Sequence, residues 1–168
     1  MIGSATHHRT ALLALGANLG DPLAQFRAVV ERLRSRLLDL QVSRVYSTAP
    51  EGGAEQPDYL NAVVRGGWAG TARELLEFAQ ELEEGAGRTR PSPGAPRTLD
   101  VDILFLGDLV LDDPDLRLPH PRWSTRPFVV VPLLDVAPDW VDPVSGRPVA
   151  TLALERGLHL GLVPLEMT

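Results

Sequence analysis

The stretch Thr98-Leu99-Asp100-Val101-Asp102-Ile103-Leu104-Phe105-Leu106 decides the fold, because it predicts an apolar strand with two carboxylates near its start. Side chains of an extended strand alternate between two faces, so Asp100 and Asp102 point the same way, roughly 7 Å apart. The opposite face then points into a core with Leu99, Val101, Ile103 and Phe105. The Asp-x-Asp pattern taken alone is also typical of an ordinary solvated strand face, and that alternative is the commoner one.

Two neighbouring carboxylates repel each other, so a cation is expected to neutralise them. Mg²⁺ fits best, because it takes one or two carboxylates and completes its octahedron with water and substrate phosphate oxygens. The pattern therefore predicts a magnesium site at Asp100 and Asp102 if the strand face is not simply solvated.

The loop before this strand carries three arginines among glycines and prolines. Between Gly85 and Leu99 there is no acidic residue, although the formal net charge of the chain is -6. A guanidinium presents a planar fork of donors that matches phosphate oxygens, so Arg88, Arg90 and Arg97 indicate a polyphosphate ligand. The loop alone is also compatible with a solvated connector. Together with the aspartates, it favours phosphoryl-transfer chemistry.

Composition excludes several classes of protein. A chain of 168 residues supports one domain with a real core, so residues 1–168 are predicted to form a single domain. The absence of cysteine excludes disulfides, thiolate zinc sites and cysteine nucleophiles. No apolar run approaches ~20 residues, and the acidic balance argues against nucleic-acid binding. Residues 1–9 lack the apolar stretch of a signal peptide and are predicted to be disordered. Together these features predict a cytoplasmic enzyme without membrane or nucleic-acid partners.

Alternating segments predict an α+β fold. Asp21 before Pro22 predicts the start of one helix, and Thr71 with Glu74 forms a capping box at the start of another. A third helix is predicted to begin near Ser124. The predicted strands are 11–15, 40–47, 59–66 and 98–106, and the first two helices are 22–38 and about 71 to 85. This β-α-β-β-α-β order is that of the ferredoxin-like fold, an antiparallel sheet with helices on one face, here with extra C-terminal elements. The other face of the sheet is expected to bind ligands.

Tyr59 and Asn61 share one face of the strand predicted at 59–66. An aromatic plane beside an amide, which both donates and accepts hydrogen bonds, suits a planar, nitrogen-rich heterocycle. A half-buried tyrosine beside a loop asparagine is the commoner explanation for such a pair. This pair therefore supports a heterocycle site only together with the phosphate-binding pattern.

Motifs from about Ala11 to Pro148 resemble those of the 6-hydroxymethyl-7,8-dihydropterin pyrophosphokinases of folate biosynthesis. The most specific match is Gly94-Ala95-Pro96-Arg97-Thr98-Leu99-Asp100-Val101-Asp102-Ile103-Leu104, which is similar to the family signature around its metal-binding aspartates. The supporting matches are Gly16-Ala17-Asn18-Leu19-Gly20, Tyr46-Ser47-Thr48, Gln56-Pro57-Asp58-Tyr59-Leu60-Asn61-Ala62, Gly87-Arg88-Thr89-Arg90, Pro119-His120-Pro121 and Arg126-Pro127-Phe128.

The resemblance implies an ATP- and Mg²⁺-dependent enzyme that transfers pyrophosphate from ATP to the hydroxymethyl group of the dihydropterin and releases AMP. It implies that Asp100 and Asp102 hold two Mg²⁺ ions. The other implied roles are phosphate handling and lid closure for Arg88, Arg90 and Arg97, ATP binding for Gln80, Glu83, Ile103, His120 and Arg126, and pterin binding for Thr48, Ala49, Tyr59, Asn61 and Phe128. Contact with neighbouring enzymes of the folate pathway is a further implied possibility.

The chain departs from the family pattern mainly in the arginine loop, which is one residue shorter between Arg90 and Arg97 and has Gly94 near a common aromatic position. These departures predict altered lid behaviour rather than a different reaction. Two other functions stay open: a ligand-binding module without catalysis on a ferredoxin-like sheet, and a nucleotide-dependent transferase with another acceptor. Tyr59, Asn61 and Phe128 argue against a different acceptor.

Overall fold

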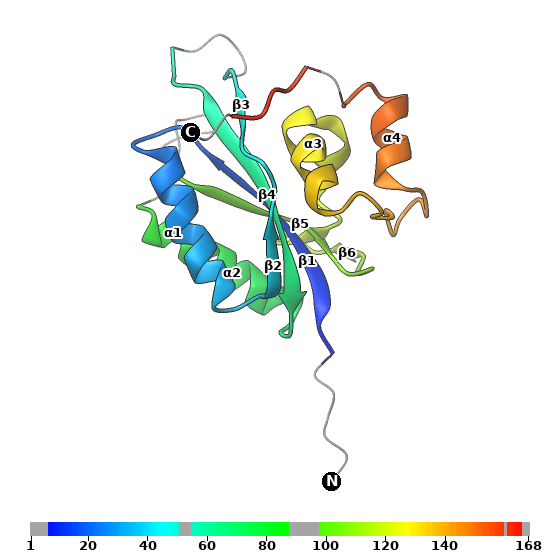
Figure 1. Ribbon diagram of the computed structural model, residues 1–168. Helices are drawn as coiled ribbons and strands as arrows, with labels where there is room; N and C mark the ends of the chain where they lie inside the picture. The colour runs from blue at the N-terminus through cyan, green and yellow to red at the C-terminus, as the bar shows by residue number, and fades with distance from the viewer. Residues whose placement is uncertain (1–6, 51–54, 88–97, 160, 166–168) are drawn as a thin grey trace.

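The computed structural model describes residues 7–50, 55–87, 98–159 and 161–165. A five-stranded antiparallel sheet forms its centre, in the order β2-β4-β1-β5 with β3 also paired to β4 (Figure 1). The strands are β1 (Arg9–Ala17), β2 (Leu38–Val42), β3 (Tyr46–Thr48), β4 (Tyr59–Trp68) and β5 (Asp100–Leu106), and a separate hairpin pairs β6 (Leu111–Asp112) with β7 (Arg117–Leu118). The helices are α1 (Pro22–Arg34), α2 (Ala72–Gly85), α3 (Pro127–Val136) and α4 (Val149–Glu155). The predicted mixture of helices with an antiparallel sheet is confirmed.

The first two helices begin where the capping signals place them. The Asp21 side chain accepts a hydrogen bond from the Ala24 N–H at 3.1 Å, and Pro22 occupies the first helical position of α1. At the start of α2, Glu74 N–H donates to Thr71 Oγ1 at 3.1 Å while Thr71 N–H donates to the Glu74 carboxylate at 2.6 Å. Both helices therefore start with N–H groups satisfied by side chains, as the sequence predicts.

The predicted strand at 40–47 is instead two short strands, β2 and β3. Ser43 lies between them, and its hydroxyl accepts the N–H of Val63 on β4 at 2.8 Å. A backbone carbonyl would take that N–H in a continuous ladder. The side-chain bond interrupts the pairing and redirects the chain into β3, which then pairs with the start of β4.

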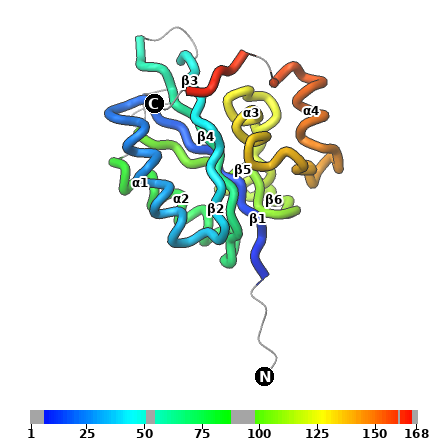
Figure 2. The backbone as a smooth tube through the Cα atoms, viewed as in Figure 1, coloured from blue at the N-terminus to red at the C-terminus, as the bar shows by residue number. Residues whose placement is uncertain are grey.

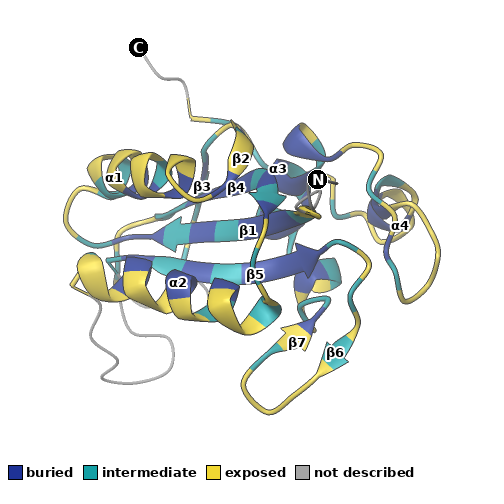
Figure 3. Ribbon diagram, turned by 90° about the horizontal axis from the view of Figure 1, so that it is seen from below, coloured by how far each residue is buried: buried dark blue, intermediate teal, exposed yellow. Residues whose placement is uncertain are grey.

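Two cores lie on the two faces of the sheet. On one face α1 and α2 cover Leu13, Leu15 and Val101, with exposed outer helix surfaces (Figure 3). On the other face α3 packs over Leu12 and Phe105, and α4 lies beside it (Figure 1). The two helices of the predicted β-α-β-β-α-β core therefore share one face, and the extra C-terminal helices lie on the other. Because α3 is rich in valine and leucine, it is stable only when buried, and it covers part of the face expected to be open to ligands.

A β-bulge in β5 changes which face its side chains occupy. Leu12 of β1 pairs with Phe105, but the next residue of β1 pairs with Ile103, so Leu104 is the extra residue. Val101 and Ile103 pack on the α1 and α2 face, as predicted. The prediction that Phe105 shares this face is wrong, because the bulge turns it into the core under α3.

A hydrogen-bonded cluster ties α3 to the start of β3. Asp135 of α3 accepts bonds from Arg44 Nη2 at 2.8 Å and from the Tyr46 hydroxyl at 2.8 Å. Burial and the Asp135 carboxylate raise the pKa of Tyr46 to about 12. Burial alone would raise the pKa of Asp135, but the hydrogen bonds from Arg44 and Tyr46 hold it below its usual value. The cluster fixes α3 against the strand that leads into the site.

Of the helices among these described residues, none combines the length and apolar character needed to cross a membrane.

Candidate active site

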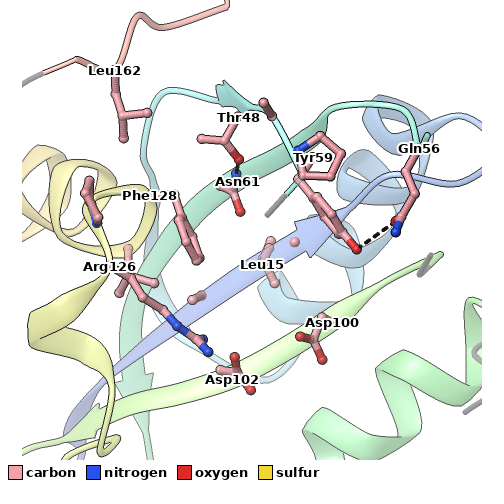
Figure 4. A pocket seen from close by; sticks show the side chains of 16 residues that line it. Leu15, Thr48, Gln56, Tyr59, Asn61, Asp100, Asp102, Arg126, Phe128 and Leu162 are labelled. Atoms are coloured by element: carbon pink, nitrogen blue, oxygen red, sulfur yellow. Dashed lines mark hydrogen bonds between the residues drawn. The ribbon is translucent and has the colours of Figure 1, made fainter. Parts of the chain in front are cut away.

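Four strands and the start of α3 line a cavity of about 410 Å³ (Figure 4). Its floor comes from β1 and β5, and its walls come from β3, β4 and α3. The residues predicted from the sequence that line it are Thr48, Ala49, Tyr59, Asn61, Asp100, Asp102, Arg126 and Phe128. The fold therefore brings the predicted pterin-binding set and both aspartates together.

Strand register places the amide and the carboxylates on one sheet face. Asn61 of β4 pairs with Gly16 of β1, which pairs in turn with Asp100 of β5. The next row on that face has Ala14 of β1 opposite Asp102. Gly16 leaves open the space between the Asn61 amide and the Asp100 carboxylate. A Cβ at this position would occupy part of that space, 3.7 Å from Asn61 Oδ1. The small residues of β1 thus form a low floor between the two sets of polar groups.

The Asn61 amide is buried and held in one orientation. Its Nδ2 donates to Thr48 Oγ1 at 2.9 Å, so its carbonyl oxygen faces the cavity floor near Gly16. An amide oxygen directed at the cavity can accept a hydrogen bond from a ligand N–H. The pair therefore provides a directed acceptor for a polar ring edge.

Aromatic side chains lie on opposite sides of the same cavity. Tyr59 of β4 and Phe128 of α3 face the space between them in Figure 4, and both are half-buried. The Tyr59 hydroxyl donates to Gln56 Oε1 at 3.4 Å, and the Arg126 guanidinium lies 5.6 Å from the centre of the Phe128 ring. A planar ligand would be stacked between the two rings.

A second, more polar cavity of about 770 Å³ lies on the other side of the aspartates. Gln80 and Glu83 of α2 line it, together with His120 from the loop after β7. Asp100, Asp102 and Arg126 line both cavities. Two carboxylates and one guanidinium thus lie between the aromatic cavity and the polar cavity. A transfer between two bound substrates requires such a shared boundary, because the reacting groups of the two substrates must meet.

The carboxylate of Glu83 supports the strand that carries the aspartates. It is 6% exposed, and it accepts the N–H of Val101 at 2.9 Å. Val101 lies between Asp100 and Asp102, so this bond fixes the backbone at the centre of the carboxylate pair. The sequence resemblance assigns Glu83 to ATP binding, whereas its position also gives it a role in placing β5.

We expect the Glu83→Ala variant to unfold with a free energy lower by about 2–3 kcal/mol, because a buried backbone N–H loses its partner. Denaturant unfolding of the purified variant measures this change. Glu84→Ala, one residue further along and exposed, is the matched control and should stay within about 0.5 kcal/mol of the wild type. Equal stabilities of the two variants would refute the supporting role.

His120 is held as a neutral imidazole. Its Nδ1 accepts the Arg122 N–H at 3.1 Å, so in the neutral form the ring proton is on Nε2. Burial lowers the pKa of His120, the positive charges of Arg126 and Arg122 lower it further, and the Asp100 carboxylate opposes them. Near pH 7 the ring therefore offers one N–H donor at the polar cavity.

We expect NMR titration to give His120 a pKa below the ordinary value of about 6.5. Between the lowered pKa and about 6.5 the unfolded chain binds more protons than the folded chain, so the free energy of unfolding rises with pH across this window. Loss of the signal in the His120→Gln variant assigns the resonance. A pKa of about 6.5 or higher would contradict the effect of burial and of the neighbouring cations Arg126 and Arg122 on the ring.

Other predicted residues lie elsewhere. The Ile103 side chain packs in the core under α1 and α2 and lines neither cavity. Arg88, Arg90 and Arg97 lie outside the described residues. The structure adds Gln56, Arg122 and Leu162 to the cavity walls. Gln56 stands in a motif noted in the sequence, but no sequence signal marks Leu162, which only the fold brings to the cavity.

The donor set at the aspartates suits Mg²⁺. Within residues 7–50, 55–87, 98–159 and 161–165, no group of three or more histidine, aspartate or glutamate side chains could hold a metal ion. Asp100 and Asp102 form a pair of hard oxygen donors, half-buried and open to the polar cavity. Mg²⁺ takes one or two carboxylates and draws its remaining ligands from water and phosphate, so the pair fits this ion.

Residues 12–138 match the family model described as 7,8-dihydro-6-hydroxymethylpterin-pyrophosphokinase (HPPK). The chain belongs to the HPPK family. Relatives named 2-amino-4-hydroxy-6-hydroxymethyldihydropteridine pyrophosphokinase include one from Synechocystis sp., 38% identical over 84% of this chain and 73% of the relative. Another, from Pseudomonas aeruginosa, is 41% identical over 76% of this chain and 80% of the relative. The resemblance inferred from the motifs is confirmed.

The fold of the HPPK family is also found in solved structures. The chain matches the crystal structure of Plasmodium falciparum HPPK-DHPS with a TM-score of 0.68, over 89% of its own length. At 14% identity this likeness shows the fold alone. The chain spans less than half, 45%, of the Plasmodium chain.

Proposed function

We propose that this HPPK family member transfers the pyrophosphoryl group of ATP to the hydroxymethyl group of 6-hydroxymethyl-7,8-dihydropterin, giving AMP and the pterin pyrophosphate for folate biosynthesis. The names of its relatives support this reaction. The observation that carries the proposal is that Asp100, Asp102 and Arg126 line both the aromatic cavity and the polar cavity. An acceptor in one and ATP in the other would meet at these three side chains.

The aromatic cavity is assigned to the pterin. A pterin ring stacked between Tyr59 and Phe128 would present its polar edge to Asn61 and Thr48, with backbone groups near Ala49. Asn61 Oδ1, oriented by its bond to Thr48, is the acceptor for a ring N–H. The hydroxymethyl group would then extend over the low floor at Gly16 toward the carboxylates.

The polar cavity is assigned to ATP. Gln80, His120 and Arg126 would contact the nucleotide, and the neutral His120 ring would donate through Nε2. Ile103 remains assigned to ATP binding by the resemblance alone. The loop arginines Arg88, Arg90 and Arg97 are assigned to phosphate handling on the same ground.

The reaction is an in-line attack of the pterin hydroxyl oxygen on the β-phosphorus of ATP. A new bond forms from that oxygen to the β-phosphorus, the hydroxyl O–H bond breaks and releases its proton to water, the bond from the β-phosphorus to the α-β bridging oxygen breaks, and AMP leaves. Asp100 and Asp102 would hold two Mg²⁺ ions, which when bound neutralise charge on the triphosphate. Arg126 and the loop arginines stabilise charge on the transferring group, while stacked aromatics hold the acceptor in position.

Broader features of the chain are also proposed. The strand order β2-β4-β1-β5, with α1 and α2 on one face, supports a ferredoxin-like sheet and one domain over residues 1–168. We place the enzyme in the cytoplasm, with ATP and the dihydropterin as its partners and neither nucleic acid nor membrane. Contact with neighbouring enzymes of the folate pathway is proposed on the motif resemblance alone.

AMP release from ATP tests the proposal. We expect release only when both 6-hydroxymethyl-7,8-dihydropterin and Mg²⁺ are present, and loss of release when EDTA removes the ion. Binding of the pterin without any nucleotide turnover would instead indicate a ligand-binding module. AMP release at the same rate with and without the pterin would indicate a transferase with another acceptor.

A further inference from the structure

A short segment near the C-terminal end of the described chain lies beside the aromatic cavity. After α4 the chain returns across α3 to the edge of the sheet at β3 (Figure 2). There the Leu165 N–H donates to the Val45 carbonyl at 2.7 Å, and Pro164 forms an antiparallel bridge with Tyr46. Residues 161–165, here called the C-terminal segment, are thus held against the strand that leads into the site.

Exposure alternates along the C-terminal segment. Leu162 and Pro164 are half-buried, whereas Val163 between them is 75% exposed. Such alternation is typical of an extended segment with one face turned inward. The inward face therefore directs Leu162, and not Val163, at the protein.

Leu162 is part of the cavity wall. It lines the aromatic cavity together with Thr48 and Phe128. Figure 4 shows its side chain directed toward the cavity at the end remote from Asp100 and Asp102. An aliphatic side chain in this position offers contact area but no hydrogen bond. It therefore suits an apolar part of a ring whose polar edge is hydrogen-bonded by Asn61.

We propose that Leu162 is a specificity-determining residue that closes the end of the acceptor pocket remote from the carboxylates. The proposal rests on the proposed pterin function of this cavity. The family match ends at residue 138, so the contact comes from a part of the chain outside that match. A contact far from the reacting hydroxyl holds substrate and transition state equally, and it therefore acts on the KM for the pterin rather than on kcat.

We expect Leu162→Ala to raise the KM for the dihydropterin about five- to tenfold, because one to two buried carbon atoms lose contact with the ligand. The KM for ATP and kcat should stay within about twofold of the wild-type values. Leu162→Met should restore the KM, since a methionine fills a similar volume. Leu162→Trp should weaken pterin binding by overfilling the same end of the cavity, and it keeps the test available if the alanine variant fails to fold.

The matched control is Val163→Ala, which alters the same segment on its exposed side. All four variants are compared by steady-state kinetics at saturating ATP, and their melting temperatures report folding. An unchanged pterin KM in folded Leu162→Ala, or an equal rise in Val163→Ala, would overturn this inference alone. Absence of pterin-dependent AMP release from the wild-type protein would instead overturn the proposed function.

Discussion

The Asp102→Asn variant is expected to lose pyrophosphoryl transfer, with kcat lowered by about 10³-fold or more. The substitution keeps the size of the side chain and removes its charge. Asp102 is half-buried on the strand between the two cavities, opposite the small Ala14, so the amide fits without displacing neighbours. What is lost is an anionic oxygen donor for the cation that neutralises the triphosphate.

Rapid quench of a single turnover with excess enzyme measures this loss without interference from product release. Asp108→Asn is the matched control, because Asp108 is an exposed aspartate in the turn directly after β5. It should react at the wild-type rate. Wild-type turnover in a folded Asp102→Asn protein would refute the metal assignment.

The second large effect is expected at Asn61. Its replacement by leucine should lower kcat/KM for the dihydropterin by about 10³-fold, because a buried ring N–H of the substrate is left without an acceptor. The KM for ATP should change by less than about twofold, since Asn61 lines the aromatic cavity and not the polar one. Selective loss of the acceptor substrate is therefore the expected signature.

Thr48→Val provides a graded comparison for this prediction. It removes the hydroxyl that accepts from Asn61 Nδ2 at 2.9 Å but leaves the amide in place. We expect a loss of about tenfold in kcat/KM for the dihydropterin, because the amide becomes free to rotate. Circular dichroism confirms folding of both variants. A parallel loss of ATP and pterin affinity in Asn61→Leu would contradict a dedicated pterin acceptor.

The sequence predicts the local structure well where side chains satisfy nearby backbone groups. The caps at Asp21 and Thr71 set the starts of α1 and α2, and alternation places Asp100 and Asp102 on one face. These features depend on neighbours along the chain. They follow from residue type and spacing alone.

The remaining features depend on contacts between distant segments, which spacing along the chain does not reveal. The extra residue Leu104 turns Phe105 to the other face, and strand register alone brings Asn61 beside Gly16. Burial of α3 over the sheet and the return of Leu162 to the cavity are likewise decided by packing. The site could therefore be predicted as a set of residues, but not as two cavities that share a carboxylate pair.

In the proposed reaction two phosphorus atoms move together from ATP to the pterin. Mass and ³¹P NMR analysis of both products from one reaction tests it most directly. We expect AMP and a pterin that carries a pyrophosphate group, with both products formed about 10³-fold more slowly by the Asp102→Asn variant. ADP together with a pterin carrying a single phosphate would contradict it.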